Sequence, residues 1–150
     1  MTPVADIMLP EITCPKSGAT LLGAALEDIC AQVQRDVRKS SATEKGDWKP
    51  MLVILTDGKP TDTMAYSEVI PRLQAAGFAK ILACAAGPKS DAAQLKRLTD
   101  FVVSLDTMDA TSFAKFFEWV SATFSKDSQS RGATDSVELP PPPPELNVVL

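Results

Sequence analysis

The chain has 150 residues, of which 45% are hydrophobic, and a formal net charge of −4. These values fit one globular domain with an ordinary core. No long basic run provides the positive surface of a nucleic-acid-binding protein, and no apolar stretch approaches the ~20 residues needed to span a bilayer. Residues 1–10 lack the basic and apolar regions of a signal peptide. We therefore expect a cytoplasmic protein without nucleic-acid or membrane partners.

The residue types present limit the chemistry of any site. Histidine is absent, which excludes Ser-His and Cys-His nucleophile pairs. The three cysteines are far apart and form no CxxC pair, which argues against a disulfide framework or a zinc site; they are Cys14, Cys30 and Cys84. Cys30 and Cys84 lie in apolar segments, so we expect them in the core. An enzyme of this composition would have to use carboxylates, lysines or a metal held by oxygen ligands.

Apolar runs that alternate with amphipathic segments predict strands alternating with helices. The predicted strands are 4–9, 51–56, 79–85 and 101–105, and the predicted helices are 20–39, 66–76, 92–98 and 110–125. This order favours a three-layer α/β/α, Rossmann-like fold with a mostly parallel sheet.

Several residues are predicted to begin, end or pack these helices. Thr20, Asp91 and Asp109 are expected N-caps, and Gly77 is expected to end the second helix. Pro71 predicts either a late start of that helix, capped by Ser67, or a kink. Gly23 is expected to allow close approach of the first helix to the sheet. The expected buried side of the last helix is Phe113, Phe116, Phe117, Val120 and Phe124.

Residues 51–58 contain the strongest functional signal. Five apolar residues run unbroken from Met51 to Leu55, which is typical of an interior parallel strand covered on both faces. The run ends at Asp57-Gly58, and ligands of open α/β sheets bind at the carboxyl ends of strands. Asp57 is therefore a candidate cation ligand. The alternative is that Asp57 only begins a turn.

Thr20 provides a second candidate ligand, in the loop before the first predicted helix. A hydroxyl and a carboxylate suit Mg²⁺, which prefers oxygen ligands, keeps several waters and leaves a position for a partner's carboxylate. An alternative function is a metal-dependent phosphohydrolase that uses Asp57 as nucleophile or ligand, provided that Asp62 and Asp106 converge on it. No glycine-rich phosphate loop with a lysine supports this alternative. A third interpretation is a structural fragment that binds no metal.

The composition changes after residue 125, which divides the chain into a domain at 1–125 and a linker and tail at 126–150. Five prolines at 140–144 favour an extended segment. The final hexamer, 145–150, is strand-like. It either adds to a sheet edge or remains a frayed tail.

Two stretches resemble von Willebrand factor type A (vWA) domains. Residues 17–26 resemble the metal-site threonine loop of that family, and residues 52–58 resemble its metal-site aspartate strand. More narrowly, the chain resembles the tellurium-resistance, TerY-like bacterial members. Three stretches carry that likeness: 45–50 with 56–62, 83–89, and the tail 139–150.

The resemblance implies a non-enzymatic interaction module of a tellurite and stress-response system. It implies Mg²⁺ at a metal-ion-dependent adhesion site, with Thr20 and Asp57 as ligands and Ser17, Gly18 and Gly58 shaping the loops. Lys59 and Asp62 are expected to be solvated loop charges.

The chain also departs from the vWA pattern. The Asp-x-Ser-x-Ser loop that supplies the family's first ligands is missing, and no stretch matches the family's first strand, first helix and second strand. We therefore expect an N-terminally truncated domain with weak metal affinity. The strand at 51–56 should then have an unpaired edge, which recruits another strand. The expected partner is a second chain, either a like subunit in a homodimer or a separate N-terminal piece.

Overall fold

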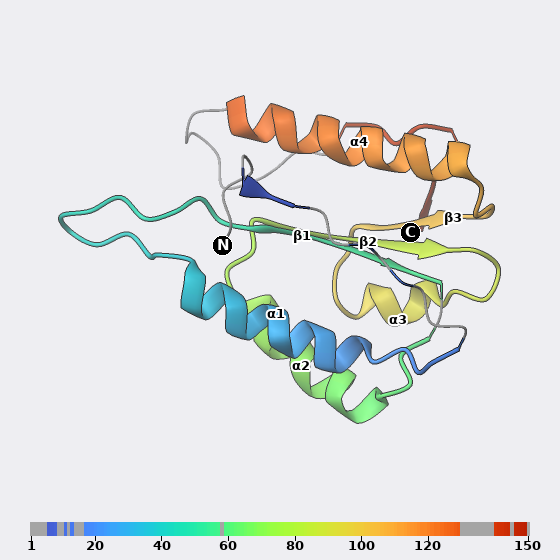
Figure 1. The fold of residues 1–150 in the computed structure, drawn as a ribbon, viewed down its shortest axis with the longest axis horizontal. Coiled ribbons are helices and arrows are strands. Elements are labelled where there is room, and N and C mark those ends of the chain that lie inside the picture. Colours follow the sequence, from blue (N-terminus) through green and yellow to red (C-terminus); the bar gives the residue numbers. More distant parts are fainter. Residues whose placement is uncertain are drawn as a thin grey trace.

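The computed structural model describes residues 6–8, 11, 13, 17–57, 59–129, 140–144 and 146–149, with side chains of the last helix described to residue 123. The sheet has the order β1-β2-β3-β4; β1, β2 and β3 are parallel, and β4 is antiparallel to β3. The elements are α1 (Leu22–Asp36), β1 (Met51–Thr56), α2 (Thr63–Ala75), β2 (Lys80–Ala86), α3 (Ala92–Lys96), β3 (Val102–Leu105), α4 (Ala110–Gln129) and β4 (Asn147–Val149). The predicted α/β class with an open, mostly parallel sheet is confirmed (Figure 1).

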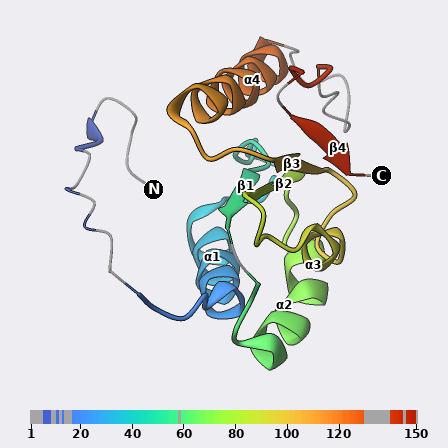
Figure 2. The ribbon, with the colours of Figure 1, turned by 90° about the vertical axis from the view of Figure 1, so that its right-hand side faces the viewer.

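The sheet separates two hydrophobic cores. Helices α1, α2 and α3 cover one face and α4 covers the other, as Figure 2 shows in an end-on view. Leu26, Val69 and Val102 belong to the first core, and Val103 and Phe116 belong to the second. This arrangement is compatible with a Rossmann-like fold. Among the described residues, no helix is long and apolar enough to cross a membrane.

Both described cysteines are core residues, as predicted. Cys30 is 1% exposed and Cys84 is 0% exposed. Burial raises the pKa of the Cys84 thiol to about 12, so this thiol stays protonated and unreactive near neutral pH. Cys14 lies outside the described residues.

The start of the second helix and the first predicted strand differ from the prediction. Helix α2 begins at Thr63 rather than near 66, because the Tyr66 backbone N–H already donates to the Asp62 carbonyl at 2.9 Å. Pro71 lies inside α2, and Gly77 follows the helix with φ 84°, a conformation in which glycine is favoured. Of the strand expected at 4–9, residues 6–8 are described and belong to no strand.

The buried side of α4 differs from the prediction. Phe117 is 52% exposed, whereas Trp119 is 7% exposed and Phe116 is fully buried. The tail explains the burial of Trp119, because its indole N–H donates to the Pro140 carbonyl at 2.9 Å. The side chain of Phe124 lies outside the described part of the helix.

The C-terminal tail forms a sheet strand, which confirms the first of the two alternatives for it. Strand β4 pairs with β3 in the register Val103 with Val148. Leu146, just before β4, is 5% exposed and belongs to the core beneath α4. The Asn147 side-chain amide donates to Asp106 Oδ2 at 3.0 Å. The tail therefore adds a strand beside β3, and β4 is the outermost strand on that side of the sheet.

The opposite edge is β1, which corrects the expectation of an interior strand. Within the described ranges, β1 pairs with β2 and with no other strand. Ile54 is buried against the first core, but Leu55 is 40% exposed. The core beneath α4 is built mainly on β2 and β3, which leaves Leu55 uncovered. Among the described residues, β1 therefore has a neighbouring strand on one side, as expected for a strand at the edge of the sheet.

Candidate functional site

Two hydrogen bonds join the Thr20 loop to the loop that follows β1. Both the backbone N–H and the hydroxyl of Thr61 donate to the Thr20 carbonyl, at 2.9 and 3.1 Å. Asp57 is the first residue after β1, so it leads into this same loop. Asp57 is exposed and Thr20 is half-buried. The fold thus places the two predicted ligands in adjoining segments at the carboxyl end of β1.

Thr20 does not occupy the N-cap position, contrary to the prediction. That position is Leu21, whose side chain makes no capping bond. Asp62 caps α1 instead, because its Oδ2 accepts from the Ala24 backbone N–H at 2.9 Å. Asp62 is therefore not a solvated loop charge; it fixes the start of α1 from the loop after β1.

The charge of Asp62 suits its place at the start of α1. Partial burial raises the pKa of the Asp62 carboxyl, but the backbone N–H groups of Ala24, Gly23, Asp62 and Leu22 together lower it by more. The folded-state pKa consequently lies below the ordinary value for aspartate. The positive end of the helix dipole favours the same charged form.

Replacing Asp62 by Asn is expected to lower the free energy of unfolding at neutral pH. The variant keeps an acceptor oxygen but loses the negative charge. Because the folded-state pKa is depressed, this stabilisation is present above the unfolded-state pKa and is lost as the pH falls through the folded-state value. Urea unfolding of both proteins from neutral pH down to about pH 3 should therefore show two curves that converge on acidification. Asp100→Asn, an exposed control, should match the wild type; a D62N curve parallel to the wild type throughout would contradict this role.

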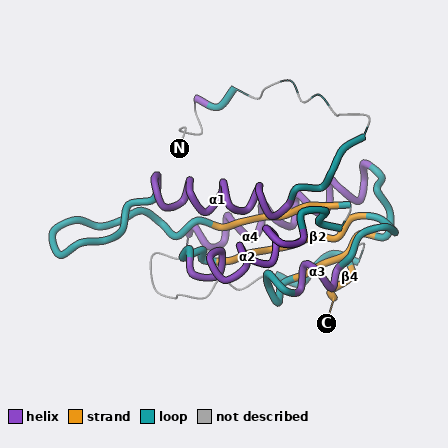
Figure 3. The backbone as a smooth tube through the Cα atoms, turned by 90° about the horizontal axis from the view of Figure 1, so that it is seen from below, coloured by secondary structure: helices purple, strands orange, loops and turns teal. Residues whose placement is uncertain are grey.

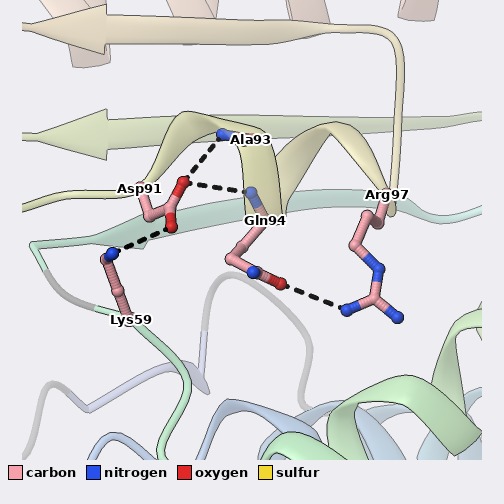
Figure 4. Close-up of polar contacts among 5 residues, drawn as sticks. All are labelled: Lys59, Asp91, Ala93, Gln94 and Arg97. Atoms are coloured by element: carbon pink, nitrogen blue, oxygen red, sulfur yellow. Dashed lines mark hydrogen bonds and ion pairs between the residues drawn. The ribbon is translucent and has the colours of Figure 1, made fainter.

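An ion pair links the loops after β1 and β2 (Figure 4). Lys59 Nζ lies 3.3 Å from Asp91 Oδ2, and Asp91 Oδ1 accepts from the Ala93 and Gln94 backbone N–H groups at 3.1 and 3.4 Å. The contact with Lys59 is the main cause that lowers the pKa of the Asp91 carboxyl. Lys59 is therefore not simply a solvated charge, and Asp91 caps α3 as predicted.

The carboxylates that a phosphohydrolase would need are bound elsewhere. Asp62 interacts with the start of α1, and Asp106 accepts from Asn147 at the β3–β4 junction. Within the described ranges, no group of three or more His, Cys, Asp or Glu side chains could hold a metal ion.

Thr20 and Asp57 fit Mg²⁺ in chemical type, but they supply only part of its shell of about six oxygen ligands. Their role as metal ligands stays a prediction. Ser17 and Gly18 are exposed in the Thr20 loop, and Gly58 lies outside the described residues.

Comparisons of the chain with protein-family models, with curated proteins and with solved structures find no match. The resemblance to vWA domains therefore rests on the residue stretches in which it was found.

Proposed function

We propose that this chain is a non-enzymatic interaction module of the vWA type, similar to the TerY-like proteins of bacterial tellurite and stress resistance. Thr20 and Asp57 supply part of the coordination shell of a Mg²⁺ ion, and a protein partner supplies further oxygen ligands. The observation that carries this proposal is the pair of hydrogen bonds from Thr61 to the Thr20 carbonyl, at 2.9 and 3.1 Å. These bonds hold the threonine loop against the loop that begins with Asp57.

The position of β1 at the edge of the sheet, as far as the described residues form it, supports the second part of the proposal. Its six residues, Met51–Thr56, contain no charge and no proline, the features that usually protect an edge strand. The half-exposed Leu55 side chain adds apolar surface beside Asp57. A strand from a second chain pairing with β1 would end next to the candidate ligands, so partner binding and metal binding would be coupled.

A calorimetric titration of Mg²⁺ tests the proposed metal site. The wild type should give a weak binding isotherm, because two protein ligands leave most of the coordination to water. Asp57→Ala should abolish that isotherm, since it removes the only charged ligand of the pair.

Asp100→Ala is the matched control, because Asp100 is an exposed aspartate at the other end of the sheet. It should retain the wild-type isotherm. Flat traces for the wild type and for D57A alike would contradict metal binding by this chain and leave a purely structural role. Equal loss of heat in both aspartate variants would indicate nonspecific charge binding.

A further inference from the structure

Residues 38–49, between α1 and β1, form a projecting arm (Figures 1 and 3). The arm extends away from the body of the molecule beyond the amino end of β1. It therefore lies at the opposite end of β1 from Thr20 and Asp57. Whatever this arm does is separate from the proposed metal site.

Hydrogen bonds between its two sides give the arm a defined structure. The Asp47 backbone N–H donates to the Arg38 carbonyl, and the Arg38 backbone N–H donates back to Asp47 Oδ2, both at 2.9 Å. Further along, the Gly46 N–H donates to Ser40 Oγ at 3.0 Å, and the Ser41 N–H donates to the Glu44 carbonyl at 2.9 Å. The arm is thus preorganised, which lowers the entropy cost of binding a partner.

Gly46 allows the two sides of the arm to approach closely. A Cβ atom at this position would lie 2.4 Å from the Ser40 backbone nitrogen and 2.6 Å from the Arg38 carbonyl oxygen. Both are backbone atoms of the opposite side, so a side chain at position 46 would push the two sides of the arm apart.

Trp48 is the largest apolar side chain that the arm exposes. It is 61% exposed. Lys45 Nζ lies 5.7 Å from the centre of its ring. Tryptophan is enriched among the residues that dominate binding energy at protein interfaces.

A cavity of about 340 Å³ lies at the base of the arm. Apolar groups from the carboxyl ends of α1 and α2 line the cavity, together with polar and charged residues of the arm. The lining includes Val33, Val37, Pro50 and Ala76, with Arg38 and Lys39 from the arm. The volume is at the small end of the ~300–1,000 Å³ found for ligand pockets, which suits one or two apolar side chains better than a large cofactor.

The charge of the arm selects the kind of partner. Four of its residues are basic and two are acidic, in a chain whose net charge is −4. Arg38 and Asp47 offset each other in charge, because the Arg38 guanidinium lies 3.7 Å from Asp47 Oδ1, so the positive excess of the arm comes from its three lysines against Glu44. Lys39 is exposed at the cavity. A locally positive surface on an acidic protein favours an acidic ligand.

We propose that the projecting arm and its cavity bind an acidic peptide segment of a partner protein. An apolar side chain of the segment enters the cavity, the carboxylates of the segment face Lys39, and Trp48 packs against the segment. This inference does not depend on metal binding by Thr20 and Asp57.

Fluorescence anisotropy with a labelled Glu-Leu-Glu-Glu-Leu-Glu peptide tests the proposal. Two comparison peptides, Lys-Leu-Lys-Lys-Leu-Lys and Glu-Ser-Glu-Glu-Ser-Glu, remove the charge match and the apolar anchors respectively. The Glu-Leu-Glu-Glu-Leu-Glu peptide should bind with the highest affinity, and added salt should lower that affinity. Trp48→Ala and Lys39→Glu should each weaken binding about tenfold.

The controls are Met64→Ala, which removes a 77% exposed apolar side chain elsewhere, and Lys89→Glu, which makes the same charge change away from the arm. Both should bind like the wild type, and circular dichroism should show all four variants folded. Absence of binding to the wild type, equal binding of the three peptides, or equal effects of W48A and M64A would overturn the proposal. Self-association that W48A abolishes would also overturn it, because the occupant would then be a second copy of the chain.

Discussion

Gly23→Ala is expected to destabilise the protein strongly, although alanine favours helices over glycine by up to about 1 kcal/mol. A Cβ atom at Gly23 would lie 2.3 Å from the Tyr66 backbone nitrogen and 2.8 Å from its Cα. These atoms belong to the backbone of α2, so the whole helix would have to move. Overpacking of this kind costs about 1–3 kcal/mol, and a clash with backbone belongs at the upper end of that range.

The same contact corrects the sequence-based explanation of Gly23. The sequence predicted close approach at this residue, but to the sheet; the neighbour is α2 instead. Tyr66 is itself fixed from the other side, because its hydroxyl donates to the Gln94 carbonyl at 2.6 Å. Helix α2 therefore has little freedom to yield to a new methyl group.

Gly18→Ala is the matched control for this prediction. A Cβ atom at Gly18 would meet nothing within 4 Å, so this variant should unfold like the wild type. Urea unfolding followed by circular dichroism gives the two free energies. If G23A and G18A proved equally stable, the close packing of α1 on α2 would be wrong.

Caps that act within a few residues could be predicted from the sequence. Asp109 Oδ1 accepts from the Ser112 backbone N–H at 2.9 Å, three residues along the chain. That bond, with those from the Thr107 and Ser112 hydroxyls, lowers the pKa of the Asp109 carboxyl to about 2. Asp91 caps α3 in the same local way. Such capping bonds join residues two or three positions apart in the chain, so the order of residue types in the sequence is sufficient to predict them.

Contacts between distant segments could not be predicted in this way. Asp62 caps α1 across 38 residues, and Trp119 is buried because its indole meets the Pro140 carbonyl 21 residues away. Periodicity within one helix contains no information about which distant segment will cover it. The prediction therefore placed Phe117 in the core and assigned the capping role to Thr20.

The candidate site falls between these two cases. Parallel strand order brings the end of β1 and the loop before α1 to one edge of the sheet, and this arrangement follows from the order of elements. The position of Thr20 beside the β1 loop depends on Thr61, for which the sequence contained no signal. The hydrogen bonds within the arm at 38–49 and the cavity at its base were not predicted from the sequence.

Leu146→Ala is expected to lower the free energy of unfolding by about 2–5 kcal/mol, the usual cost of truncating a buried leucine. Leu146 is 5% exposed and packs in the core that contains Val103, Leu105 and Phe116. It precedes the three-residue strand β4, in which Asn147 and Val148 are exposed and Val149 is only partly buried. The loss should therefore release the tail from β3 as well as leave a cavity.

Val148→Ala separates the role of the core contact from that of the strand itself. Val148 lies in β4 but is 52% exposed, so its truncation should cost far less than that of Leu146. Tryptophan emission in a Trp48→Phe background reports the tail directly, because Trp119 is then the remaining tryptophan. Leu146→Ala should shift that emission to longer wavelength as the Pro140 contact is lost, and V148A should not. Equal stability and emission in both variants would show that the tail is held by its backbone pairing alone.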